Sequence, residues 1–269
     1  MYSTKKKIVK LFGINFDGYT LSEAVFTSRK FIQKKKSNVC HYVVTPNVNH
    51  VVQLQSNQHF RDAYASASIV LADGMPLIWF SKFFRQPLPE RVAGSDFVPA
   101  LLKALANDRL TVFLLGARPG IAKLAAERII KQYPKIKIVG YYSPPIGFEN
   151  DTIENKKIIG LINAVKPQLL ILGLGAPKQE LWIYSKSKEL EVNIAICAGA
   201  TIDFLSGKKL RAPLWMRKHY IEWLHRIYCE PQRLSLRYLK DSFIFMIVVL
   251  KELYNILRSD PDSCEGKYQ

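Results

Sequence analysis

Four short polar segments follow strand-like hydrophobic runs in this chain, and they constrain its fold more than any other feature. In each segment a run of Val, Ile, Leu or Ala ends at Gly, Pro or Asn, and reactive side chains follow. The segments are VVTPNVNH at 43–50, LADGMPL at 71–77, LGLGAPKQE at 172–180 and CAGATIDFLSG at 197–207. Because ligands of open α/β sheets bind just beyond the carboxyl ends of the strands, we expect these segments to form one site.

Strand-like and helix-like patterns alternate up to about residue 200, which is typical of a mostly parallel sheet with helices on both faces. The expected strands lie at about 8–12, 39–45, 68–72, 111–116, 136–141, 168–173 and 193–198. The expected helices lie at about 20–35, 47–66, 95–107, 119–133, 151–166 and 177–190, with Thr20, Asn47, Ser95 and Pro119 as cap or first-turn residues. We predict an α/β fold with a Rossmann-like core over residues 1–207.

The composition changes after the core. Residues 208–240 contain nine Lys or Arg and two acidic residues. Apolar residues recur there at helical spacing, and a second amphipathic stretch runs from about residue 232 to 257. This predicts a basic helical appendage over 208–257 and a disordered polar tail over 258–269. The apolar part at 243–257 suits either a membrane anchor or an oligomer contact, so a homo-oligomer stays possible.

The net charge and the cysteine pattern restrict the kinds of partner and the cellular compartment that we expect. The net charge of +17 favours nucleic acid, anionic lipid or phosphorylated substrates, but no nucleic-acid-binding signature is present. The longest apolar run is far shorter than the roughly 20 residues of a membrane-spanning helix, and the N-terminus lacks the apolar core of a signal peptide. The four cysteines show no CxxC spacing, which argues against disulfides and zinc. We expect a cytoplasmic protein that lies on the inner face of the membrane.

Asp73 and the TPN segment supply the candidate catalytic groups. A carboxylate at a strand-to-helix corner can act as a general base toward a sugar hydroxyl, although Asp73 also suits a helix cap. The hydroxyl of Thr45 and the amide of Asn47 suit sugar or phosphate oxygens. Capping of the following helix by Asn47 is an equally good interpretation.

The two later segments favour a nucleotide ligand without a dinucleotide cofactor. The GxGxxG fingerprint would need a glycine at position 178, where this chain has Lys178. Gln179 lies in the first turn of a helix that starts at a proline, which is favourable for anions. Asp203 is a lone acid among apolar residues, suited to a base or ribose hydroxyl or else to a buried turn. The only D-x-D, at 260–262, has no strand before it, so we predict a metal-independent site.

Three arginines in the appendage recur at helical spacing among aromatic and apolar residues. Arg226, Arg233 and Arg237 fit a surface that faces anionic lipid or a group that reaches a diphosphate. A solvated basic face is the simpler alternative.

Together these segments resemble the WecG/TagA/CpsF family of bacterial glycosyltransferases. The resemblance covers roughly residues 8–240 and lies in TPN-x-N at 45–49, ADG-x-P at 72–76, R-x-x-G-x-D at 91–96, G-x-G-x-P-x-QE at 173–180, AG-x-x-x-DFLSG at 198–207, RAP at 211–213 and the segment at 222–239. It implies inverting transfer of a sugar from a UDP-sugar to a polyprenyl-diphosphate-linked sugar. The stretch after Lys240 is longer and more apolar than the resemblance leads us to expect.

The resemblance also implies a role for each candidate residue. Asp73 would be the general base, and Thr45 would be the second catalytic residue. Thr45, Asn47 and Arg91 would line the acceptor and sugar side of the site. Gln179 and Asp203 would hold the nucleotide or the donor. The arginines of the appendage would dock on the membrane and contact the leaving diphosphate. A non-catalytic module that binds a UDP-sugar or a lipid diphosphate is the alternative, and it would bind UDP without turnover.

Overall fold

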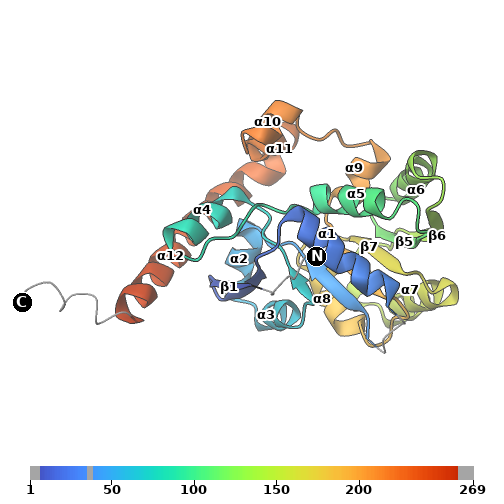
Figure 1. Ribbon diagram of the computed structural model, residues 1–269, viewed down its shortest axis with the longest axis horizontal. Coiled ribbons are helices and arrows are strands. Elements are labelled where there is room, and N and C mark those ends of the chain that lie inside the picture. The colour runs from blue at the N-terminus through green and yellow to red at the C-terminus, as the bar shows by residue number, and fades with distance from the viewer. Residues whose placement is uncertain (1–6, 35–38, 260–269) are drawn as a thin grey trace, which may run out of the picture.

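A six-stranded parallel sheet forms the centre of the protein in the computed structural model, which describes residues 7–34 and 39–259 (Figure 1). The strand order is β4-β3-β8-β7-β5-β6. The strands are β3 (His41–Val44), β4 (Ile69–Val70), β5 (Thr111–Gly116), β6 (Lys137–Tyr142), β7 (Leu169–Gly173) and β8 (Ile194–Cys197). Every neighbouring pair in this sheet is parallel, which confirms the predicted α/β class.

Alternating strand residues face two separate hydrophobic clusters, one on each face of the sheet. Leu170 and Leu172 belong to the first cluster, whereas Leu169 and Ile171 belong to the second, as the two-residue period of a strand requires. The first cluster is covered by α2 (Val48–Leu54), α3 (Gln58–Ala65), α7 (Thr152–Val165) and α8 (Lys178–Lys186). The second is covered by α1 (Leu21–Gln33), α5 (Gly94–Ala104), α6 (Ile121–Gln132) and α9 (Thr201–Ser206). The helices thus cover both faces, as expected.

An antiparallel hairpin precedes the sheet where one strand was predicted. Its strands are β1 (Ile8–Leu11) and β2 (Ile14–Asp17). Phe12 and Gly13 make the turn, both with positive φ. The Asp17 carboxylate accepts a hydrogen bond from the Val70 amide at 2.8 Å, so the hairpin is attached to the edge strand β4.

Several helix boundaries differ from those predicted. The expected helix at 47–66 is divided into α2 and α3, because Asn57 caps a new helix. A short helix α4 (Met75–Phe83) follows the ADG-x-P segment, and the short η1 (Phe148–Asn150) precedes α7. Thr20 forms the expected capping box with Glu23. Ser95 lies inside the first turn of α5, and α6 begins after Pro119, with Gly120 as its N-cap.

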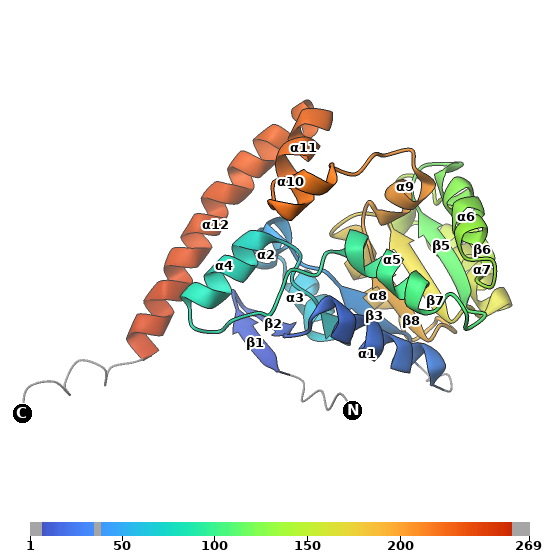
Figure 2. The same ribbon diagram turned by 45° about the horizontal axis from the view of Figure 1, so that its top comes forward.

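The C-terminal segment forms three helices, α10 (Leu214–Lys218), α11 (Glu222–Cys229) and α12 (Pro231–Ser259). Figure 2 shows an extended segment that leads from α9 to α10 and α11, from which α12 runs back along the body beside α4. The Phe245 ring of α12 contacts the rings of Phe12 and Phe80 at centroid distances of 5.2 and 5.7 Å. The expected tail at 258–269 lies outside the described residues, except that α12 continues to Ser259.

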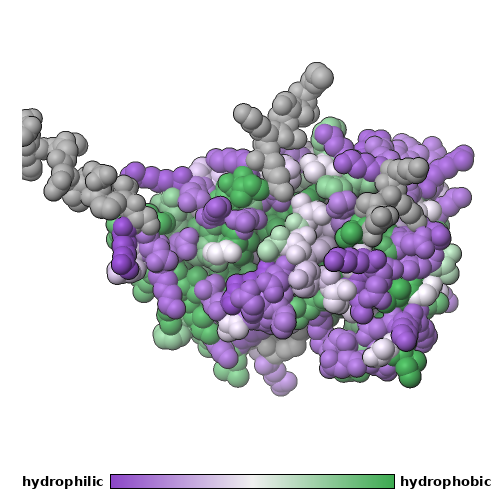
Figure 3. All heavy atoms as spheres, turned by 90° about the horizontal axis from the view of Figure 1, so that it is seen from below, coloured by the Kyte–Doolittle hydropathy of each residue, from purple (hydrophilic) through white to green (hydrophobic). Residues whose placement is uncertain are grey.

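The outer face of α12 remains apolar. Its exposed large side chains follow helical spacing and are Leu236, Leu239, Phe243, Met246, Ile247, Leu250, Tyr254 and Leu257. In Figure 3 hydrophobic atoms are more extensive on the half of the molecule that carries α12 and α4 than on the opposite half. No helix within the described ranges is long and apolar enough to cross a membrane.

Candidate active site

The four polar segments meet at the carboxyl edge of the sheet, and the segment after β7 is joined to the segment after β8 by the hydrogen bond that the Gly199 amide donates to Gln179. Strand β3 lies between β4 and β8, so the segments that follow these strands are neighbours. The Asp73 amide donates to the Pro46 carbonyl at 2.8 Å, and the Thr45 hydroxyl donates to the Cys197 carbonyl at 3.5 Å. A Cβ placed on Gly94 would lie 3.3 Å from the Thr45 hydroxyl, which brings the start of α5 to the same place.

The Asp73 carboxylate is not a helix cap. Gly74 is the N-cap of α4, and no side chain caps that helix. The carboxylate instead faces Arg91 at 3.4 Å, and 23% of the Asp73 side chain remains exposed. Burial raises the pKa of Asp73 to about 6 against the lowering effect of Arg91 and Arg226. A carboxylate with a pKa near neutrality is suited to accept a proton during a reaction.

A chain of alternating charges connects this carboxylate to the appendage. Arg91 also binds Asp96 at 2.9 Å, and Asp96 binds Arg211 at 2.7 Å. The chain continues through Glu222, which lies 3.6 Å from Arg211 and 3.1 Å from Arg226. The appendage is therefore joined to the candidate base by ion pairs, which is an arrangement that sequence spacing does not reveal.

Asp96, Arg211 and Glu222 were missed as site residues. Each lies in a segment that carried the family resemblance, namely R-x-x-G-x-D, RAP and the segment beginning at residue 222. The signal was therefore present as motif membership, but nothing in the sequence shows that the three side chains pair with one another.

The three arginines of the appendage have different positions. Arg226 lies on α11, and its charge acts on Asp73. Arg237 is exposed on α12, with its guanidinium 5.7 Å from the centre of the Tyr238 ring, and its charge acts on His50. Arg233 lies in the first turn of α12, and its side chain is outside what the structure describes. Of the two arginines whose side chains the structure describes, Arg226 is therefore the one whose charge acts on the candidate base.

The side chains of Asn47 and Gln179 both form hydrogen bonds within the protein. The Asn47 side chain caps α2 by accepting from the amides of Asn49 and His50, so the capping interpretation is confirmed. Gln179 is 3% exposed. Its carbonyl oxygen accepts from the Gly199 amide at 3.1 Å, and its amide nitrogen donates to Glu180 at 2.8 Å. Gln179 therefore holds the turn after β8.

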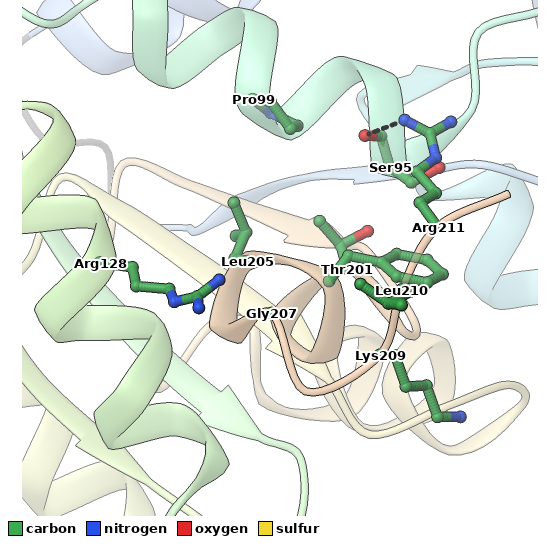
Figure 4. Close-up of a pocket in the computed structure, with 10 residues that line it drawn as sticks. Ser95, Pro99, Arg128, Thr201, Leu205, Gly207, Lys209, Leu210 and Arg211 are labelled. Atoms are coloured by element: carbon green, nitrogen blue, oxygen red, sulfur yellow. Dashed lines mark hydrogen bonds between the residues drawn. The ribbon is translucent and has the colours of Figure 1, made fainter. Parts of the chain in front are cut away.

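A pocket of 330 Å³ adjoins the site between α5, α6 and α9. Figure 4 shows Arg128 of α6 reaching toward the turn at Gly207, and Arg211 donating to the Ser95 carbonyl at 3.0 Å. Lys209 lies on the same rim. Asp203, partly exposed, lies on α9, which forms one wall of this pocket. Arg128, Lys209 and Arg211 contribute positive charge to a lining that also includes apolar side chains, and Arg211 connects the pocket to the chain of charges that ends at Asp73.

Cys40 and Cys197 are buried free thiols. Among the residues that the structure describes, no group of three or more His, Cys, Asp and Glu side chains could hold a metal ion.

The parallel α/β sheet gathers a carboxylate and arginines at its carboxyl edge, which is where ligands of such sheets bind. The chain belongs to the WecG/TagA/CpsF family of glycosyl transferases, whose family model matches residues 9–259. The matched region includes the apolar stretch after Lys240.

Two similar proteins come from Staphylococcus aureus strains NCTC 8325 / PS 47 and COL. Both are named N-acetylglucosaminyldiphosphoundecaprenol N-acetyl-beta-D-mannosaminyltransferase. Each is 28% identical over 243 residues, which is 90% of this chain and 92% of the relative.

Proposed function

We propose that this protein transfers a sugar from a UDP-sugar to a polyprenyl-diphosphate-linked saccharide, with inversion at the anomeric carbon and with Asp73 as the general base. The observation that carries the proposal is the position of Asp73, whose carboxylate lies at the carboxyl edge of the sheet between Arg91 and the appendage. The names of the relatives support an acceptor that carries undecaprenyl diphosphate. The product would enter a cell-surface polymer such as teichoic acid, another cell wall polysaccharide or an exopolysaccharide.

The proposed step moves one proton and one sugar. The acceptor hydroxyl gives its proton to Asp73 while its oxygen bonds to the anomeric carbon from the face opposite UDP. The bond from that carbon to the β-phosphate oxygen breaks at the same time, and UDP leaves with both electrons. Thr45, Asn47 and Arg91 would border the acceptor and sugar side, because they lie around Asp73.

The negative charge on the departing UDP would be met by arginines without a divalent metal. The charge of Arg226 acts on the base, and Arg233 and Arg237 follow on the next helix. Preorganised cations that face a developing charge are among the largest contributions to catalysis. The cationic pocket of Arg128, Lys209 and Arg211 would take the nucleotide beside Asp203, while Gln179 would shape the adjoining turn.

The appendage would hold the enzyme against the inner face of the membrane, where its lipid-linked acceptor lies. The apolar outer face of α12 is bordered by Lys240, Lys251 and Arg258, all exposed. An apolar stripe bordered by cations is typical of helices that lie in the surface of an anionic bilayer.

A UDP-release assay tests this proposal. UDP-N-acetylmannosamine, its uronic acid and UDP-glucose would each be supplied with and without a polyprenyl-diphosphate-linked sugar, in the presence and absence of EDTA. We expect release with one donor that requires the acceptor, persists in EDTA and is lost in Asp73→Asn. UDP binding without release from any donor would instead favour the non-catalytic module, and equal release by Asp73→Asn would remove Asp73 from the mechanism.

A further inference from the structure

A buried carboxyl group lies behind the candidate active site with no role in the proposed chemistry. Glu180 of α8 is 1% exposed, and burial raises its pKa to about 7. Its Oε2 atom has no hydrogen-bond partner among the described residues, and neither has the buried Tyr64 hydroxyl. A buried polar atom without a partner costs stability, and such exceptions are expected at functional sites.

The other oxygen of Glu180 connects to one turn of the site. Glu180 Oε1 accepts from Gln179 Nε2 at 2.8 Å. The carbonyl oxygen of the same Gln179 amide accepts from the Gly199 N–H at 3.1 Å. Gly199 has a positive φ and belongs to the turn after β8, next to Thr45 and Gly94.

Glu180 also faces the second turn through His50. The Asn47 N–H donates to His50 Nδ1 at 3.0 Å, so the neutral imidazole carries its proton on Nε2. That nitrogen lies 3.9 Å from Glu180 Oε1. Burial lowers the pKa of His50 to about 4, and the ring is therefore neutral at physiological pH. One carboxyl oxygen thus lies between the groups that hold the Asn47 and Gly199 amides.

We propose that Glu180 is a positioning residue that fixes the two turns on either side of the active site relative to each other. It acts through Gln179 on the Gly199 turn and through His50 on the Asn47 turn. Its effect on turnover rests on the function proposed above, whereas its effect on the turns does not.

The physical reason is the symmetry of the glutamine side chain. A carboxamide can rotate by half a turn within almost the same volume, which exchanges its donor and its acceptor. The Gln179 carbonyl stays toward the Gly199 N–H because its NH₂ group has an acceptor in Glu180. Without that acceptor the bond from the Gly199 N–H is the only one of these two hydrogen bonds that still orients the amide, so the bond to the turn is held less firmly.

Hydrogen exchange of the two turn amides tests this proposal independently of any activity. Glu180→Leu removes the acceptor and keeps an apolar side chain of similar size, whereas Glu180→Gln keeps an acceptor at the same position. We expect the Gly199 amide to exchange about three- to tenfold faster in Glu180→Leu than in wild type, from the net worth of one hydrogen bond. The Asn47 amide should show a smaller increase, and Glu180→Gln should stay close to wild type at both amides.

The melting temperature separates positioning from general stability. Glu180→Leu removes a buried oxygen that has no partner but leaves the buried Gln179 NH₂ group without its acceptor, so its melting temperature should stay within about 2–4 °C of wild type. Glu180→Met serves the same purpose if the leucine variant does not fold. Unchanged exchange at Gly199 in a folded apolar variant, or equally faster exchange in Glu180→Gln, would overturn the proposal.

A double-mutant cycle extends the test to turnover. If Glu180 acts through Gln179, then Glu180→Leu lowers kcat in the wild-type background and causes little further loss in a Gln179→Ala background. Losses that multiply would contradict action through Gln179. If the wild-type protein released no UDP, the proposed function would be rejected. The hydrogen-exchange result would still decide the structural role of Glu180.

Discussion

Removing the charge of Arg91 should move the acid side of the pH–activity profile toward neutrality. Asp73 must be ionised to act as a base, and its pKa of about 6 reflects burial, which raises it, against Arg91 and Arg226, which lower it. Arg91→Met keeps much of the apolar volume of the side chain but removes the cation 3.4 Å from the carboxylate. The pKa of Asp73 should therefore rise.

The size of the expected rise in the Asp73 pKa depends on how strongly Arg91 interacts with each of its two carboxylate partners. An opposite charge within about 4–6 Å lowers a carboxyl pKa by roughly 1–3 units. Arg91 lies closer to Asp96, at 2.9 Å, than to Asp73, so we take the lower end of that range. A rise of about one unit, or about 1.4 kcal/mol, would leave Asp73 almost fully ionised at pH 8.5. At pH 5.5 it would lower the ionised fraction of Asp73, and with it the activity, about eightfold relative to wild type.

The assay is kcat/KM from UDP release between pH 5.5 and 8.5, with each variant normalised to its own value at pH 8.5. Normalisation removes any loss caused by missing acceptor contacts. Arg91→Lys is the matched control, because it keeps the charge and loses the planar fork of the guanidinium. An acid limb that does not move in Arg91→Met, or that moves equally in both variants, would refute the argument that Arg91 sets the ionisation of Asp73.

Two further outcomes can be checked with the purified protein. Leu239→Glu combined with Phe243→Glu should weaken binding to phosphatidylglycerol vesicles in a flotation assay by at least about tenfold, because burying each apolar side chain is worth roughly 1.5–3 kcal/mol. Ser242→Glu is the control for added charge, and a change of oligomeric state instead of vesicle binding would favour a second copy on this face. Gly116→Ala should lower the free energy of unfolding by at least about 3 kcal/mol, because its Cβ would lie 2.5 Å from the Gly173 carbonyl oxygen at a φ of +117°. Gly120→Ala, where φ is also positive but no atom lies within 4 Å, should cost only the backbone strain, and equal melting temperatures for the two variants would contradict this reasoning.

The sheet could be predicted because buried parallel strands are continuous apolar runs. Strand β5, expected at 111–116, has those bounds in the structure. The hairpin and the helix after Asp73 were missed for local reasons. The turn at Phe12 and Gly13 is too short to divide an apolar run, and Pro76 after Gly74 resembles a turn although proline is also favoured in the first helical turn.

The candidate site was only partly predictable. The segments after β3, β4, β7 and β8 could be placed at one edge from the rule for α/β sheets, and the structure brings them together. The ion pairs of Asp96 with Arg211 and of Arg211 with Glu222 join residues from three separate segments. Sequence periodicity carries no information about such tertiary pairs, so these residues emerge only from the fold.

The pairing of β3 with β8 has a consequence for biosynthesis of the protein. Val43 of β3 pairs with Ile196 of β8, so a ribosome that adds about 5–20 residues per second takes roughly 8–30 s between the two strands. Throughout this interval β3 has an unpaired apolar edge, which is the kind of surface that chaperones protect. A nascent chain that stops before β8 also lacks the turn beside Thr45. The crevice at the sheet edge can therefore form only after β8 and this turn have been translated.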